Sequence, residues 1–363
     1  MKGRVAMAMS GGVDSSVAAT LLKEQGYEII GLHMKLYHGP DSQRQKSCCS
    51  LDEAMDARAV CHRLDIPFYV IDFQEEFQTH VIDYFINEYT NGRTPNPCVK
   101  CNQNIKSRYL LQKADELECD YLATGHYAKI VKNPESGRLQ LVKPADLLKD
   151  QTYFLYGIQS SELHRLLFPL QDYVKTDVRG IADQWKLASA FKPDSQEICF
   201  VSDDYRQFLQ KHWTTQPEPG NFVNTEGKLL GTHKGLPFYT VGQRRGLGVS
   251  AEKPYYVIRL DQKNNQVVLG QENQLYAQTV HVQQVNWVSI DPLQAPVCAN
   301  VKLRYSHQGS EATLIPLSED TLRIELHAPA KSVTPGQAAV FYQDDVLLGG
   351  GWIERSEMKT DTV

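Results

Sequence analysis

The sequence predicts an α/β fold in three parts: a doubly wound parallel sheet over residues 1–204, a small mostly β domain over 205–278, and a carboxy-terminal β-barrel over 279–363. Three observations predict it. Strand-like and helix-like segments alternate through about the first 200 residues, which favours a parallel sheet covered by helices. Two hairpin patterns follow. Beyond residue 280 only short, regularly spaced β-like runs remain, which is typical of a small barrel.

The elements of the first part are read from apolar runs and their spacing. A capping box at residues 50–53 (Ser-Leu-Asp-Glu) opens one helix, whose apolar residues recur at helical spacing. Strands are expected at residues 4–9, 27–34, 68–73 and 120–125, and helices at 17–23, 51–64, 75–89 and 104–118. Ligands of such sheets lie beyond the carboxyl ends of the strands. Ser10, Met34 and Gly125 fall at these ends and are expected to border one pocket.

The second and third parts are expected to be β structure. Residues 220–229 form one hairpin pattern, and residues 255–261 and 266–270 form another across a polar turn. The barrel strands are expected at residues 280–288, 297–305, 312–317, 322–326 and 338–342.

The composition limits the class of protein. The chain has 38 Lys and Arg against 43 Asp and Glu, a net charge of −5, so any site for nucleic acid must be a local patch. The sequence shows no signal-peptide pattern and no apolar run of the roughly 20 residues that span a bilayer. We therefore expect a cytoplasmic protein without a membrane partner. Its eight cysteines are then expected to be reduced, metal-binding or catalytic.

Residues 10–16 (Ser-Gly-Gly-Val-Asp-Ser-Ser) connect the first strand to the first helix. Two glycines let the backbone turn tightly and approach a ligand, and the helix that follows directs its amide groups and positive dipole end toward it. This predicts a phosphate site, to which Ser10, Ser15 and Ser16 add hydroxyls, while Asp14 either binds magnesium or caps the helix. The loop lacks the Lys-Ser/Thr pair of a Walker A motif and the glycine spacing of a dinucleotide fold.

Three cysteines outside the expected core allow three interpretations. Cys98 and Cys101 precede an expected helix, and Cys199 lies about a hundred residues further on. In the first interpretation, Cys98 and Cys101 are half of a zinc site, although no second pair is present. Alternatively, all three hold an iron–sulfur cluster with one open iron. In the third interpretation, Cys101 and Cys199 form a reactive dithiol pair that handles sulfur. The sequence also predicts that Cys61, Cys119 and Cys298 are packed in the protein, and it assigns no role to Cys48 and Cys49.

Several motifs together resemble one family, the bacterial tRNA-specific 2-thiouridylases of the pyrophosphatase-loop ATPase superfamily. The resemblance extends from the first strand to Ile353 and rests most specifically on the two cysteine motifs in this order. Its motifs are Ser-Gly-Gly-Val-Asp-Ser-Ser from residue 10, Gly-Arg-Thr-Pro-Asn-Pro-Cys-x-x-Cys-Asn from 92, Ala-Thr-Gly-His-Tyr-Ala from 123, Lys-Asp-Gln-Thr-Tyr-Phe-Leu from 149, Gln-Glu-Ile-Cys-Phe from 196, Gly-Gln-Arg-Arg-Gly-Leu from 242 and Gly-Gly-Gly-Trp-Ile from 349.

The resemblance implies an adenine nucleotide alpha hydrolase-like fold and an enzyme that replaces O2 of the wobble uridine of tRNA with sulfur. ATP, with Mg²⁺, would bind at Ala8, Met9, Ser10, Gly11, Gly12, Val13, Asp14, Ser15, Met34 and Gly125. Cys199 would carry a persulfide received from a donor protein, and Cys101 would be the partner thiol that closes a Cys101–Cys199 disulfide. Asn96, Pro97 and Cys98 would contact the target base. The expected tRNA contacts are His126, Lys149, Asp150, Gln151, Arg304, Tyr305 and Gln343, with Arg304 and Tyr305 expected in a strand.

One position departs from part of the family. Some relatives have Asp, with an acid–base role, where this chain has Cys98, and this difference keeps the iron–sulfur interpretation open. Two other functions are consistent with parts of the sequence. An amide-forming or argininosuccinate-type synthetase would use the loop but gives the cysteines no task, and an RNA-binding or cluster-storage protein would bind tRNA without ATP turnover.

Overall fold

The computed structural model describes residues 2–37, 51–187, 189–190, 192, 198–201, 204–213, 216–250 and 252–358. Three expectations lie outside this range: Cys48 and Cys49, the Ser50 end of the capping box, and Gln196 and Glu197 of the second cysteine motif.

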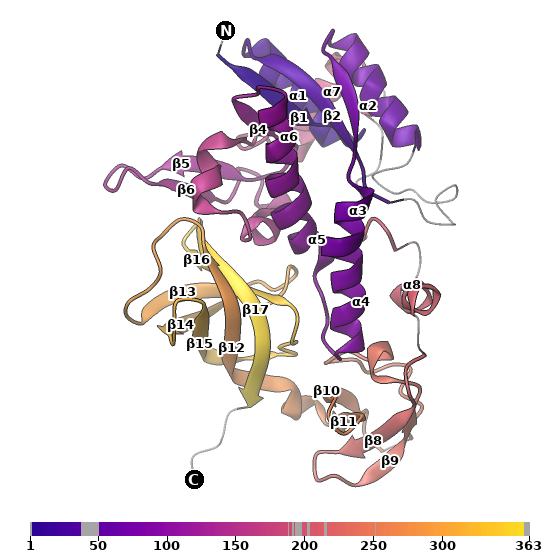
Figure 1. The fold of residues 1–363 in the computed structure, drawn as a ribbon. Helices are drawn as coiled ribbons and strands as arrows, with labels where there is room; N and C mark the ends of the chain where they lie inside the picture. The colour runs from indigo at the N-terminus through magenta and orange to yellow at the C-terminus, as the bar shows by residue number, and fades with distance from the viewer. Residues whose placement is uncertain are drawn as a thin grey trace.

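The amino-terminal part is a five-stranded parallel sheet in the order β3-β2-β1-β4-β7 (Figure 1). Its strands are β1 (Arg4–Ala8), β2 (Glu28–Lys35), β3 (Phe68–Asp72), β4 (Tyr121–Ala123) and β7 (Leu166–Leu167). The four expected strands are confirmed. The strand β7 is too short to give a periodic signal in the sequence.

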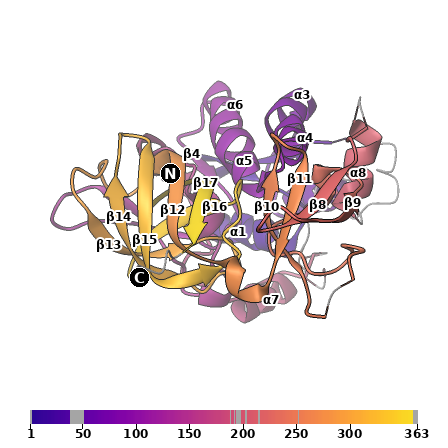
Figure 2. The same cartoon turned by 90° about the horizontal axis from the view of Figure 1, so that it is seen from below.

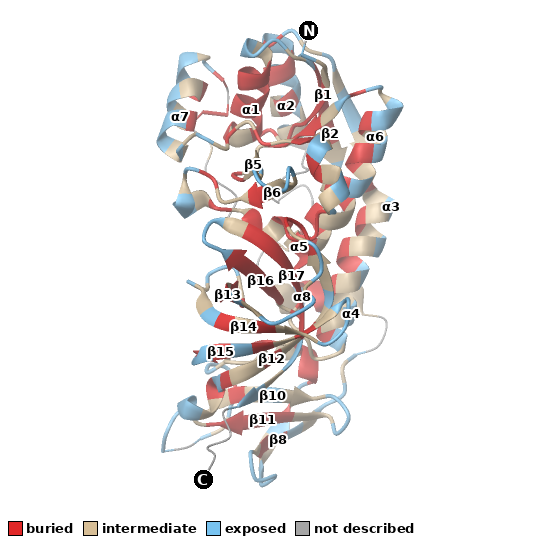
Figure 3. Cartoon of the chain, turned by 90° about the vertical axis from the view of Figure 1, so that its left-hand side faces the viewer, coloured by how far each residue is buried: buried red, intermediate tan, exposed pale blue. Residues whose placement is uncertain are grey.

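Helices cover both faces of this sheet, because successive side chains of a strand point to opposite faces. Val5 and Met7 of β1 pack with the helices α1 (Val13–Glu24), α2 (Leu51–Arg63) and α7 (Lys175–Gln184). Ala6 and Ala8 face the other side, toward the long helices. The buried centre of the sheet is visible in Figure 3. The sheet is therefore doubly wound, as the sequence predicts.

Two long helices form that other layer, and both contain π-helical segments. One consists of α3 (Gln74–Phe77), η1 (Gln78–Ile82) and α4 (Asp83–Thr90), and the other of α5 (Pro97–Lys100), η2 (Cys101–Tyr109) and α6 (Leu110–Glu116). The second helix begins at Pro97, not near residue 104 as expected. Asn96 caps it by accepting the amide of Val99, and proline suits its first position. Cys98 and Cys101 thus lie within the helix, not before it.

The central part is a four-stranded sheet in the order β10-β11-β8-β9, preceded by α8 (Tyr205–His212). Its strands are β8 (Gly220–Asn224), β9 (Leu229–His233), β10 (Tyr256–Asp261) and β11 (Gln266–Gly270). Both expected hairpins are present as antiparallel pairs, and β11 pairs with β8 in parallel.

The carboxy-terminal part is a β-barrel closed by the pairing of β12 with β17 (Figures 1 and 2). Its strands are β12 (Tyr276–Trp287), β13 (Val297–Lys302), β14 (Ser310–Pro316), β15 (Thr321–Lys331), β16 (Ala338–Gln343) and β17 (Val346–Met358). Strand β17 was not expected, since three consecutive glycines disfavour a strand. Gly350 is required there, because a Cβ atom would lie 2.7 Å from the ring of Tyr156.

Two further predictions about this region are wrong. Strand β13 ends at Lys302, and Arg304 and Tyr305 lie in the turn that follows, which the hydrogen bond from the His307 amide to the Arg304 carbonyl closes. Cys298 lies at an outward-facing position of β13 and is exposed, not packed.

A hairpin of the amino-terminal part extends the barrel sheet. It consists of β5 (Lys129–Lys132) and β6 (Leu139–Val142), and β6 pairs with β17 through Leu141 opposite Leu347. Asn286 of β12 strengthens this connection by donating to the carbonyls of Tyr156 and Ile158, at 2.7 and 2.8 Å. The first and last parts therefore share hydrogen-bonded structure and not only a linker.

The part of the chain that the structure describes also contains five short 3₁₀ helices: η3 (Leu147–Lys149), η4 (Thr152–Leu155), η5 (Ser160–Arg165), η6 (Leu236–Phe238) and η7 (Glu272–Leu275). Within the described residues, no helix has the length and apolar character required to cross a membrane.

Candidate functional site

The Ser-Gly-Gly loop folds into a compact cradle between β1 and α1. The hydroxyl of Ser10 lies 3.1 Å from that of Ser15 and accepts the amide of Gly12, while Ser15 and Ser16 donate to the Gly12 carbonyl. Gly11 has a φ of +80°, and a Cβ atom there would lie 2.4 Å from the carbonyl oxygen of Glu53. Helix α1 begins after Gly12 without a side-chain cap. No side chain caps its first amides, and uncapped amides at a helix start suit phosphate oxygens.

Asp14, in the first turn of α1, is held by two residues that the sequence analysis did not identify. The ammonium of Lys175 lies 2.7 and 2.8 Å from its two carboxylate oxygens, and the Tyr127 hydroxyl donates to one of them at 3.0 Å. Asp14 does not cap the helix, so that alternative is wrong. A magnesium ion prefers oxygen ligands, and this carboxylate, already arranged against a cation, fits one that would arrive with a nucleotide.

A second lysine lies beside the loop. Lys192 forms an ion pair with Asp56 and lies 3.5 Å from the Gly11 carbonyl, while Ser189 donates to the hydroxyl of Ser16 at 3.0 Å. No local sequence signal identifies Lys175 or Lys192, because only the fold returns the chain to the loop more than 150 residues later.

The other two residues expected at this pocket lie on neighbouring strands. Gly125 follows β4 and packs on the loop so closely that a Cβ atom would lie 2.7 Å from the Ser15 nitrogen. Met34 is half-buried near the end of β2 and packs against the large hydrophobic cluster. Ser10 and Gly125 are therefore brought together at the carboxyl edge of the sheet.

Cys101 and Cys199 lie against the same hydrophobic cluster. Cys101 is buried in the long helix that begins at Pro97, and half-buried Cys199 packs on the cluster from a separate segment. The neighbouring Phe200 anchors that segment, since its ring makes edge-on contacts with Phe77 and Phe85 at centroid distances of 5.7 and 5.2 Å. Two cysteines about a hundred residues apart in the chain thus pack on the same hydrophobic cluster.

The same residues do not form a metal site in this structure. Among the residues that the structure describes, which include Cys98, Cys101 and Cys199, no three His, Cys, Asp or Glu side chains are grouped closely enough to hold a metal ion. The three thiols therefore do not converge as an iron–sulfur or zinc site requires.

The segment expected to contact the target base is fixed between the long helices and the barrel. Asn96 and Pro97 are buried, and Cys98 is half-buried. The Thr94 amide donates to the Pro335 carbonyl at 2.8 Å, and the Gln337 side chain donates to the Thr94 carbonyl at 3.0 Å. The barrel therefore positions the start of the cysteine-bearing helix.

Two of the expected tRNA contacts make hydrogen bonds inside the protein. The buried carboxylate of Asp150 accepts both the amide and the hydroxyl of Thr152, at 2.9 and 2.6 Å. Gln151 exchanges hydrogen bonds with the backbone of Tyr127. These contacts connect the 149–151 segment to Tyr127, the residue that holds Asp14.

An aromatic and basic patch surrounds Tyr305. This exposed ring lies 4.5 Å from that of Phe154, with the Lys302 ammonium 5.7 Å from its centroid. The charge of Lys149 opposes the burial that raises the pKa of Tyr305. Arg304 donates a hydrogen bond to the Lys331 carbonyl. Gln343 is exposed at the end of β16. A local patch with an exposed ring and several cations suits RNA, although the whole chain is acidic.

His126 differs from the rest of this set in its electrostatics. Burial, together with the charge of Lys106, holds the pKa of His126 well below its usual value of 6.5. Its Nδ1 lies 2.8 Å from the Thr124 hydroxyl. The ring is neutral near pH 7, so it offers hydrogen bonding and not a positive charge.

Comparison with known proteins places all three parts in described families. Residues 3–203 match the tRNA methyl transferase HUP domain, residues 206–271 the tRNA methyl transferase PRC-barrel domain, and residues 277–353 the aminomethyltransferase beta-barrel domain. The tRNA-specific 2-thiouridylase MnmA of Clostridioides difficile (strain 630) is 47% identical over 358 residues, covering 98% of this chain and 99% of that protein.

A second relative and one solved structure are also similar. The tRNA-specific 2-thiouridylase MnmA of Symbiobacterium thermophilum is 48% identical over 360 residues, covering 97% of this chain and 92% of its own. A 4-thiouridine synthetase in complex with RNA and ATP is 15% identical, with 58% of this chain and 50% of that chain covered and a TM-score of 0.37. That likeness is too low to support any argument about function.

Proposed function

Because this chain belongs to the tRNA-specific 2-thiouridylase family, we propose that it uses ATP to activate O2 of the wobble uridine and replaces that oxygen with sulfur carried by Cys199. The observation that supports the proposal is the combination of a glycine- and serine-rich cradle at residues 10–16 with two cysteines that pack on one hydrophobic cluster. The relatives that match over nearly their whole length are named for thiolation, so methyl transfer is not proposed.

The loop serves the activation step. A uridine carbonyl oxygen is a poor leaving group, and ATP supplies the adenylate that makes it a good one. O2 attacks the α-phosphorus and pyrophosphate leaves. The amides of the first turn of α1 and the hydroxyls of Ser10 and Ser15 hold the pyrophosphate oxygens. Asp14, held in place by Lys175, would be the residue that holds the Mg²⁺ accompanying ATP, and the ion would neutralise phosphate charge there.

The cysteines serve the substitution. A donor protein leaves a persulfide on Cys199, and its terminal sulfur attacks C2 of the base, so that AMP departs with the original oxygen. Cys101 as thiolate then attacks the Cys199 sulfur. The bond between the Cys199 sulfur and the sulfur attached to C2 breaks. 2-Thiouridine is released, and a Cys101–Cys199 disulfide forms. A thiol reductant returns both residues to thiols with two electrons. In the alternative order, Cys101 attacks the persulfide first and the released sulfide attacks C2, with the same disulfide as product.

Substrate placement completes the proposal. Asn96 to Cys98 contact the flipped target base, and the patch around Tyr305, with Lys149 and Gln343, contacts the tRNA. His126 contributes as a neutral ring, and Asp150 and Gln151 position this surface. Cys98 has no carboxylate chemistry, so proton transfer to the leaving oxygen is assigned to no residue of this motif.

The test is mass spectrometry of tRNA nucleosides after incubation with ATP, magnesium and a persulfide source. We expect 2-thiouridine at the wobble position and none with Cys199→Ala. Cys298→Ala, at an exposed thiol on the barrel, is the matched control and should leave the yield unchanged. Unchanged product from Cys199→Ala would contradict the persulfide role. Activity that appears only after anaerobic reconstitution with iron and sulfide would favour a cluster mechanism.

A further inference from the structure

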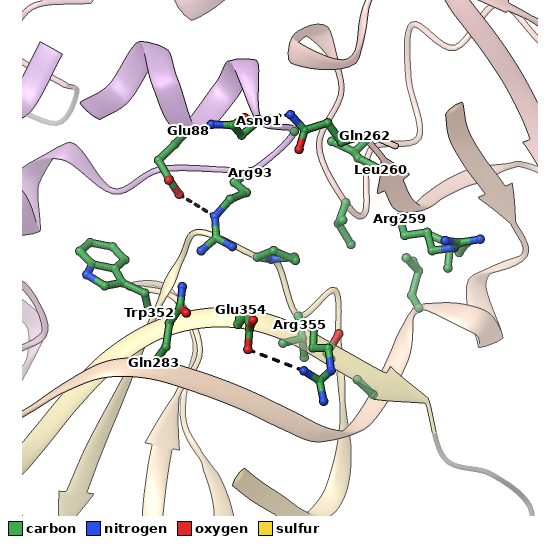
Figure 4. A pocket seen from close by; sticks show the side chains of 18 of the residues that line it. Glu88, Asn91, Arg93, Arg259, Leu260, Gln262, Gln283, Trp352, Glu354 and Arg355 are labelled. Atoms are coloured by element: carbon green, nitrogen blue, oxygen red, sulfur yellow. Dashed lines mark hydrogen bonds and ion pairs between the residues drawn. The ribbon is translucent and has the colours of Figure 1, made fainter. Parts of the chain in front are cut away.

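A cavity of about 850 Å³ lies where the three parts of the chain meet, and neither the loop nor the cysteine pair lines it. Its walls come from α4 and the turn after it, from α5, from β10 of the central sheet, and from β12 and β17 of the barrel (Figure 4). Its volume is in the range of roughly 300–1,000 Å³ typical of ligand pockets. We call it the junction cavity.

Positive charge exceeds negative charge in the junction cavity. Four cationic side chains line it against two acidic ones: Arg93, Lys100, Arg259 and Arg355 against Glu88 and Glu354. The arginines already have acidic neighbours, as Figure 4 shows for Arg93 with Glu88 and for Arg355 with Glu354. Arg259 lies 3.4 Å from Asp261.

Lys100 is the exception among these cations. Within the described residues it forms no ion pair, and its ammonium lies over two rings instead, 5.3 Å from the centroid of Tyr84 and 5.1 Å from that of Trp352. Such contacts hold a cation in place without neutralising it. Burial lowers the pKa of Lys100, opposed by the charge of Glu88. An anion entering the cavity would favour the charged form of Lys100 and so offset the cost of its burial.

The chain connects this lysine directly to the segment assigned to the target base. Lys100 and Arg93 both line the junction cavity, and Asn96 to Cys98 lie between them. Lys100 is three residues beyond Pro97, which is about one turn of helix and roughly 5 Å along its axis. Since the segment is hydrogen-bonded to the barrel through Thr94, the cavity and the base segment keep a fixed relation.

We propose that the junction cavity is an RNA subsite that receives a nucleotide adjacent to the target uridine, with a phosphate of that nucleotide bound by Lys100. The proposal rests on the proposed function, because it takes the base position from Asn96 to Cys98. A nucleotide offers both groups that the cavity accommodates, a phosphate for the ammonium and a base for the polar and aromatic wall. An acidic protein segment offers only negative charge for the ammonium and no base for the polar and aromatic wall. It also has no reason to lie beside Asn96 to Cys98.

The experiment measures binding of an anticodon stem-loop RNA by fluorescence anisotropy across a salt series. Lys100→Met keeps the buried stem and removes the charge, so we expect about tenfold weaker binding at low salt. The slope of log K against log salt should become shallower by about 0.7–0.9, the value for one lost phosphate contact. Lys100→Arg should retain the slope. Lys228→Met, at an exposed hairpin position outside the cavity, should behave as the unaltered protein.

A second measurement locates the phosphate. Single methylphosphonate substitutions on either side of the uridine remove one charge each. One of them should weaken binding to the unaltered protein and have no further effect on Lys100→Met. An unchanged salt slope in Lys100→Met, with unchanged thermal unfolding, would overturn the proposal. So would a variant that binds RNA normally but accepts sulfur slowly from a persulfide-bearing protein, because the cavity would then bind protein.

These outcomes are separable from those of the proposed function. RNA binding needs neither ATP nor a thiol, whereas thiolation is read from the nucleosides. A protein without thiolating activity that still shows the Lys100-dependent slope would contradict the proposed function and support the RNA subsite.

Discussion

The ammonium of Lys175 contacts both carboxylate oxygens of Asp14, at 2.7 and 2.8 Å, although the two residues are 161 positions apart. The contact joins the first residue of α7 to the first turn of α1, and the Lys175 side chain is only 12% exposed. Tyr127 donates to the same carboxylate. The loop proposed to receive the nucleotide is thus held from outside by α7 and by the segment after β4.

The first prediction concerns this ion pair. Lys175→Met preserves the aliphatic stem but leaves the Asp14 carboxylate with Tyr127 alone. Hydrogen bonds to charged groups contribute about 1.5–3 kcal/mol, so we expect the KM for ATP in tRNA-dependent pyrophosphate release to rise about tenfold or more. Lys186→Met, at an exposed lysine just after the same helix, is the control. Equal KM values for the two variants would mean that Lys175 has no part in nucleotide binding.

Much of the α/β part could be predicted from the sequence because its signals are local. The apolar runs of β1 to β3 and the capping and periodicity of the helices need no tertiary information. The start of the cysteine-bearing helix is hard to locate from the sequence because polar Asn102 and Asn104 obscure its periodicity, although Asn96 and Pro97 are a cap and first-turn pair. The loop was recognised for the same local reason.

What could not be predicted depends on contacts between distant segments. Strand β17 contains three consecutive glycines, which disfavour a strand, yet Gly350 is needed there because Tyr156 of another part of the chain packs where a Cβ atom would lie. The junction cavity, the pairing of β6 with β17, and the lysines beside the loop depend on tertiary structure alone. The sequence predicts a reactive pair of Cys101 and Cys199 from chemical need alone, and it carries no information on their geometry.

The second prediction uses two glycines in different surroundings. A Cβ atom on Gly125 would lie 2.7 Å from the Ser15 nitrogen, whereas one on Gly180 in α7 would meet nothing within 4 Å. Gly125→Ala should displace the first turn of α1 and abolish measurable ATP binding in calorimetry. Gly180→Ala should bind ATP normally and raise the free energy of unfolding by about 0.5–1 kcal/mol, since alanine favours a helix interior. Normal ATP binding by Gly125→Ala would show that the loop tolerates displacement.

The third prediction follows from the lowered pKa of His126, which burial causes chiefly and Lys106 increases. Below the unfolded-state pKa of about 6.5, the unfolded chain binds a proton that the native ring does not. The free energy of unfolding therefore falls as pH drops below 6.5, by at most about 1.4 kcal/mol per pH unit from this group.

His126→Gln removes that term and can still hydrogen-bond Thr124. In urea unfolding between pH 7.5 and 5.5, the variant should lose less stability on acidification than the unaltered protein. His62→Gln, at an exposed histidine, should follow the unaltered protein. If His126→Gln shows the same pH dependence as the unaltered protein, the His126 pKa is not lowered in the folded state.

The last prediction separates activation from sulfur transfer at Cys101. In the proposed chemistry the loop alone forms the adenylate, and Cys101 acts only after sulfur has arrived. Cys101→Ser should therefore release pyrophosphate with tRNA and ATP in the first turnover but accumulate no 2-thiouridine. Mass spectrometry of the intact protein should find tRNA disulfide-linked to Cys199 through the new sulfur or, in the alternative order of steps, an unresolved persulfide on Cys199, because no thiol at residue 101 is present to resolve either. The serine hydroxyl cannot replace the thiolate as a nucleophile. It does preserve the size and burial of the side chain. If Cys101→Ser yields normal 2-thiouridine, then resolution comes from an external thiol, and the packing of the two cysteines on one cluster serves the fold instead.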